Sequence, residues 1–118
     1  MMFEIIENGR LIYAIEELLR KGLRLASFKE VWTLRKEGKI PMQWYDTGTL
    51  VYKGNIRSVT LEELKNIKEI YKSGGRLLCL GSVGNYNISN AYDYDILVSN
   101  NGRLVGVRPE AGKKKRIK

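Results

Sequence analysis

Residues 80 to 98 constrain the fold of this chain more than any other stretch. An apolar run, Arg76–Leu80, ends at Gly81-Ser82, and after ten further residues Asp93-Tyr94-Asp95 leads into a second apolar run. Short apolar runs that are bounded by glycine and polar residues are typical of β-strands. Because side chains alternate between the faces of a strand, we expect both aspartates on one face, roughly 6–7 Å apart.

This pattern predicts a particular chemistry. Two carboxylates at such a distance repel each other, and a hard divalent cation such as Mg²⁺ or Mn²⁺ relieves the repulsion. Gly81 lets backbone N–H groups approach phosphate oxygens closely, and the Ser82 hydroxyl adds a donor. A phosphate cradle that faces a carboxylate pair suits phosphoryl or nucleotidyl transfer, in which metal ions hold the attacking and leaving oxygens.

The stretch resembles the signature of the DNA polymerase β-like nucleotidyltransferase superfamily, and looks most like its minimal nucleotidyltransferases. Their motif is Gly-Ser, about ten residues, then Asp-x-Asp, and the resemblance covers Thr60–Ser99. It implies that Asp93 and Asp95 are catalytic metal ligands. It also implies that Gly81 and Ser82 contact a nucleoside triphosphate, whose nucleoside monophosphate is transferred to a hydroxyl acceptor on nucleic acid or protein.

The chain departs from the family pattern in three ways. Val83-Gly84-Asn85 replaces the family's Arg-Gly or Lys-Gly, the motif lies late in the chain, and Glu110 is the only acidic residue after Val98. Glu110 is therefore the candidate third metal ligand. The alternative that suits these departures is a catalytically inactive nucleic-acid-binding or regulatory protein. Some relatives are antitoxins, so a protein partner that completes the fold is a further alternative.

Composition excludes several classes of site. The chain has 118 residues and no histidine, which excludes histidine-based triads and histidine-ligated zinc. The single Cys79 excludes an internal disulfide. There is no apolar stretch of membrane-spanning length and no signal-peptide pattern, so we expect a cytoplasmic protein. Abundant Lys, Glu, Arg and Ile resemble a thermophile's composition. The net charge of +8 and the pI of about 9.7 favour polyanionic partners.

Residues 1–59 are predicted to form a helical pair followed by a β-hairpin. Apolar spacing predicts a helix over Arg10–Lys21, and a capping box at Ser27–Glu30 predicts a second one to about Glu37. Thr49–Lys53 and Ile56–Val59 are β-prone and predict the hairpin, with a separate turn at Asp46-Thr47-Gly48. This segment is either winged-helix-like or a plain helical hairpin. The winged-helix alternative predicts a nucleic-acid surface made of Arg35, Lys36, Lys39, Lys53 and Arg57.

Residues 60–112 are predicted to form the nucleotidyltransferase-like core, a helix–strand–turn–hairpin unit with a mixed sheet. A capping box at Thr60–Glu63 predicts a helix to Ser73. Asn100-Asn101-Gly102 predicts a hairpin in which Asp95 faces Val107 and Asp93 faces Pro109, so that Glu110 lies close to the two aspartates. The expected fold class is therefore α+β.

Residues 113–118 form a basic tail. Its cations are candidate nucleic-acid contacts, and the alternative is a solubilising end. They are Lys113, Lys114, Lys115, Arg116 and Lys118.

Overall fold

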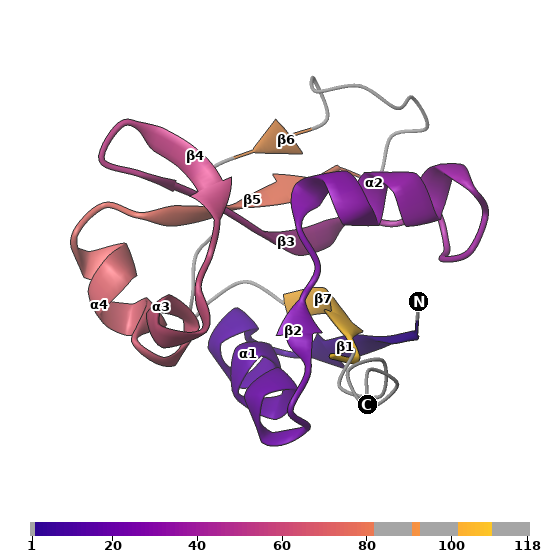
Figure 1. Cartoon of the computed structure of the whole chain (residues 1–118), viewed down its shortest axis with the longest axis horizontal. Coiled ribbons are helices and arrows are strands. Elements are labelled where there is room, and N and C mark those ends of the chain that lie inside the picture. Colours follow the sequence, from indigo (N-terminus) through magenta and orange to yellow (C-terminus); the bar gives the residue numbers. More distant parts are fainter. Residues whose placement is uncertain (1, 82–90, 93–101, 110–118) are drawn as a thin grey trace, which may run out of the picture.

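The computed structural model describes residues 2–81, 91–92 and 102–109 (Figure 1). These residues have an α+β fold, as predicted, and within them no helix is both long and apolar enough to cross a membrane. The elements, in chain order, are β1 (Phe3–Asn8), α1 (Leu11–Arg20), β2 (Arg24–Leu25), α2 (Phe28–Lys36), β3 (Tyr45–Tyr52), β4 (Asn55–Ser58), α3 (Leu61–Lys65), α4 (Ile67–Lys72), β5 (Arg76–Leu80), β6 (Ala91–Tyr92) and β7 (Gly102–Val107).

The strands of the described residues form one mixed sheet. Its order is β1-β7-β3-β5-β6, with β2 beside β7 and β4 beside β3. Neighbours are antiparallel except β3 and β7, which are parallel and pair at Asp46 and Leu104. Because β1 pairs with β7 and β3 pairs with β5, the segments 1–59 and 60–112 both supply strands to the same sheet.

Helices cover both faces of this sheet (Figure 1). On one face, α1 packs its apolar stripe into a core cluster that includes Leu18, Leu50 and Leu104. On the other face, α2 contributes Val31 to a cluster that includes Leu80. The apolar residues whose spacing predicted the first helix therefore lie on the face that α1 buries.

Local signals located the helices well. The predicted helix over Arg10–Lys21 is confirmed as α1. Both capping boxes are confirmed, because Ser27 and Thr60 each accept a hydrogen bond from the backbone of the glutamate three residues later. The helix expected from Thr60 to Ser73 is interrupted at Asn66, which separates α3 from α4. The predicted strand Arg76–Leu80 is confirmed as β5.

The turn predicted at Asp46-Thr47-Gly48 is wrong, because these residues lie buried inside β3. The polar side chains of these residues have hydrogen-bond partners in the sheet. The Thr47 hydroxyl donates to the Leu78 carbonyl at 2.9 Å, and the Asp46 carboxylate accepts a hydrogen bond from the backbone N–H of Arg103 at 3.2 Å. A Cβ on Gly48 would lie 2.8 Å from the Leu25 carbonyl oxygen. Gly48 is therefore needed because two chain segments approach each other closely here. In the sequence alone, a glycine with this role cannot be told from a glycine in a turn.

The register expected for the last hairpin is also wrong. Val107 pairs with Phe3 of β1 on one side and with Arg24 of β2 on the other. A strand has only two edges, so Asp95 cannot face Val107 as the hairpin signal suggested. The reasoning that brought Glu110 toward the aspartates through this hairpin therefore falls, and Glu110 itself lies outside the described residues.

The surface expected of a winged helix is not formed as predicted. Arg35 is only 1% exposed, and Arg57 is paired with Glu63 at 2.7 Å. The hairpin of β3 and β4 turns at Lys53-Gly54 and is part of the main sheet. A nucleic-acid surface that needs both arginines free is therefore excluded.

The second capping box predicts a measurable pH dependence. Arg57 and the Thr60 backbone hold the pKa of Glu63 down from its usual 4.5 to about 2. Since the folded pKa is the lower one, the contribution of Glu63 to stability is complete above about pH 4.5 and is lost as the pH falls toward 2. NMR titration of the Glu63 carboxyl should give a midpoint near 2, and Arg57→Gln should move it upward. A wild-type midpoint near 4.5 would contradict the observed pairing.

Candidate active site

Five strand ends meet at one end of the sheet. The antiparallel pairs join Leu80 to Tyr45 and to Ala91, and Gly102 to Asn8. Because β3 is parallel to β7, the starts of β3, β6 and β7 lie at the same end as the finishes of β1 and β5. We call this region the Gly81 end, defined by Glu7, Trp44, Gly81 and Arg103.

Gly81 lies directly after β5 and is buried. Its carbonyl accepts a hydrogen bond from Nη1 of Arg35, which belongs to α2. The same nitrogen donates to the Gln43 carbonyl at 2.9 Å. A buried guanidinium thus joins the end of β5 to the segment that precedes β3, and it places a positive charge behind Gly81.

Arg103 and Trp44 form a second feature of the Gly81 end. The guanidinium carbon of Arg103 lies 4.4 Å from the centroid of the Trp44 ring, a cation–π contact. Nε of Arg103 donates to Glu7 at 2.8 Å, and Nη1 donates to the Trp44 carbonyl at 3.2 Å. With neighbouring glycines and Asn8, these residues line a hollow of about 260 Å³. Three contacts from one side chain hold Arg103 in place.

Sequence reasoning missed this pair. Neither residue belongs to a motif that the sequence alone reveals. The two residues are 59 positions apart, and their contact depends on the parallel placement of β3 and β7. No local pattern could have revealed it.

Tyr45, next to Trp44, belongs to the hydrophobic core. Its hydroxyl donates to the Pro41 carbonyl at 2.9 Å, and the residue is fully buried. Burial raises the pKa of this hydroxyl, and the charges of Arg103 and Arg35 partly oppose that rise. Tyr45 is therefore neutral near pH 7 and has a packing role.

Of the residues predicted for the nucleotide and metal site and for the basic tail, only Gly81 lies within the described part of the chain. Ser82, Asp93, Asp95, Glu110 and the basic tail fall outside it. Asp93 directly follows Tyr92, and Tyr92 pairs with Cys79. β5, which is followed by Gly81, is thus the neighbour of β6, the short strand that precedes Asp93 in the chain.

The described residues contain no complete metal site of their own. Residues 2–81, 91–92 and 102–109 contain no group of three side chains from His, Cys, Asp and Glu that could hold an ion. Asp46 contributes a buried carboxylate at the Gly81 end, 2% exposed, which accepts the Arg103 N–H. The aspartates implied as ligands are not among these residues, so the metal site remains an inference from the sequence.

Comparison with known proteins gives no relative. No protein-family model matches the chain, and no significant match was found among curated proteins or solved structures. Function must therefore be argued from the residues themselves.

Proposed function

We propose that this protein is a nucleotidyltransferase-like protein that binds a nucleoside triphosphate at the Gly81 end of the sheet. The reaction is metal-dependent transfer of a nucleoside monophosphate to a hydroxyl acceptor. One observation carries the proposal: β5, which ends one residue before Gly81, pairs antiparallel with β6, the short strand that precedes Asp93 in the chain. The strands that precede the two halves of the sequence motif are therefore neighbours in the sheet, which supports a shared site.

The residues have distinct roles in this proposal. Gly81 and Ser82 contact the phosphates, and Asp93 and Asp95 hold the divalent cation. Carboxylate oxygens suit Mg²⁺ and Mn²⁺, which supply charge neutralisation on the phosphates when bound. Arg35 is a positioning residue, because it holds the Gly81 carbonyl from behind.

Charge supports the same ligand class. The whole chain carries a net charge of +8. Such a charge favours a polyanion such as a triphosphate over a neutral or cationic ligand.

A second candidate function is nucleic-acid binding or regulation without catalysis. It is favoured by the basic tail and by the missing cation after Gly81-Ser82. This candidate predicts binding to nucleic acid that weakens steeply with salt and needs no divalent cation.

Thermal denaturation in the presence of nucleotides tests the first proposal. At a hundredfold excess of nucleoside triphosphate over its Kd, binding adds about 2.7 kcal/mol of stability and raises Tm by several degrees. We expect this rise only with Mg²⁺ or Mn²⁺. Asp93→Asn and Asp95→Asn should remove it, whereas Glu62→Gln, a change at an exposed carboxylate of α3, should keep it.

The opposite pattern would refute the proposal. A rise that is independent of metal, or one that survives in both aspartate variants, would show that these carboxylates do not hold the nucleotide's cation.

A further inference from the structure

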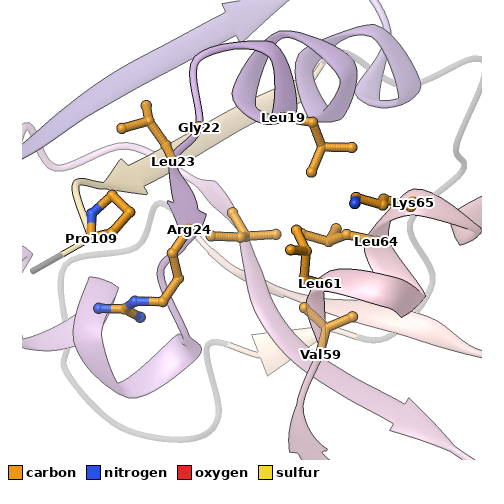
Figure 2. Close-up of a pocket in the computed structure, with 10 residues that line it drawn as sticks. Leu19, Gly22, Leu23, Arg24, Val59, Leu61, Leu64, Lys65 and Pro109 are labelled. Atoms are coloured by element: carbon orange, nitrogen blue, oxygen red, sulfur yellow. The ribbon is translucent and has the colours of Figure 1, made fainter. Parts of the chain in front are cut away.

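A cavity of about 420 Å³ opens between the end of α1, β2 and α3 (Figure 2). This volume is within the usual range of small-molecule sites. The cavity is lined mainly by aliphatic side chains, namely Leu19, Leu23, Leu25, Val59, Leu61 and Leu64.

The lining shows that the hydrophobic core reaches the surface here. Leu23, Leu25 and Leu64 are buried members of the cluster beneath α1. Leu61, at the start of α3, is 57% exposed. An apolar wall that is continuous with the core offers favourable contacts to an apolar ligand.

The charged side chains that line the cavity, among the described residues, are those of Arg24 and Lys65, and both are basic. None of the described residues that line it is acidic. Arg24 lies at one side of the cavity, where its guanidinium nitrogens donate to the two carboxylate oxygens of Glu30 at 2.8 and 3.1 Å. Lys65 is exposed, and Figure 2 shows its amine on the cavity side of α3. Pro109 also lines the cavity.

We propose that this cavity binds a small free amphiphile that has one apolar chain and one anionic head group, such as a medium-chain fatty acid. The chain occupies the aliphatic cavity and the head group pairs with Lys65. The aliphatic lining selects the chain, and the lack of an acidic lining residue selects the sign of the head group. The site shares no residue with the Gly81 end, so this proposal is independent of the proposed function.

Decanoate, kept below its micelle concentration, is the probe. Added to the isotopically labelled full-length protein, it should shift the amide signals of Leu19, Gly22, Leu64 and Lys65 in a saturable way. Octanoate, which is two methylenes shorter, should bind roughly fifteenfold more weakly, because each buried methylene contributes about fourfold in affinity. Decyltrimethylammonium, which has the opposite charge, should not bind.

Two variants locate the contacts. Lys65→Glu should weaken decanoate binding about three- to tenfold, the range expected for reversing one exposed charge. Lys68→Glu, an exposed lysine of α4 that does not line the cavity, is the matched control and should leave the affinity unchanged. Leu61→Ala should weaken binding while the fold is kept, because the side chain is mostly exposed.

Three results would overturn the proposal. The first is an absence of saturable shifts at the cavity. The second is equal affinity for decanoate and octanoate. The third is a decanoate affinity that Lys65→Glu and Lys68→Glu change to the same extent.

Discussion

Arg35→Met should lower the free energy of unfolding by about 3 kcal/mol. Methionine fills much of the same space but donates no hydrogen bond. The carbonyls of Gln43 and Gly81 would then lose their donor in a region where the arginine is 1% exposed. Each buried carbonyl left without a partner costs about 1–3 kcal/mol. Arg35→Lys retains a cation and one donor group, so its effect should be smaller.

Urea denaturation measures this loss. Arg20→Met provides the matched control, because Arg20 lies exposed at the end of α1 and should change stability by less than about 0.5 kcal/mol. If Arg35→Met were as mild as Arg20→Met, the buried guanidinium would not be what holds the end of β5.

Gly102→Val should be destabilising by about 3 kcal/mol or more. A Cβ at Gly102 would lie 2.7 Å from the Cα of Leu11 and 2.9 Å from the Cβ of Ala14. The first of these is a backbone atom, so relief of the clash requires α1 to move away from β7. That movement would open the contact between the helix and the sheet, on which the core cluster beneath α1 depends.

The matched control is Gly9→Val. A Cβ at Gly9 would meet nothing within 4 Å, so we expect a small effect. The two variants can be compared by their denaturation midpoints in urea. Equal midpoints would mean that α1 does not pack as closely on β7 as the structure shows.

The sequence predicted what depends on neighbouring residues. Both capping boxes, at Ser27 and Thr60, act over three residues, and both are present in the structure. The strand of Arg76–Leu80 is marked by an apolar run and by a glycine on each side. Such features need no knowledge of the rest of the fold.

The sequence could not predict what depends on strand order. Phe3–Asn8 was not predicted as a strand, and it becomes one because it pairs along the full length of β7. The same pairing occupies an edge of β7 and defeats the expected hairpin. Arg35 and Lys36 are neighbours in the sequence, and both resembled surface charges. In the structure Lys36 is exposed, whereas Arg35 is buried. Its partners come from two segments that the sheet brings together.

Some features of the candidate site could likewise be predicted from the sequence, whereas others depend on the fold. The Gly-Ser and Asp-x-Asp motif could be read from the sequence, and the pairing of β5 with β6 is consistent with it. The contacts of Arg35 with Gly81 and of Arg103 with Trp44 required the fold.

Paramagnetic broadening by Mn²⁺ tests the central claim most directly. With a nucleoside triphosphate present, Mn²⁺ held by Asp93 and Asp95 should broaden the amide signals of Leu80, Gly81 and Tyr92 first. Signals at the opposite end of the sheet, such as those of Arg24 and Val107, should remain sharp, and Asp93→Asn with Asp95→Asn should restore those of the Gly81 end. Broadening that is centred elsewhere, or that persists unchanged in the double variant, would contradict a metal–nucleotide site at this end of the sheet.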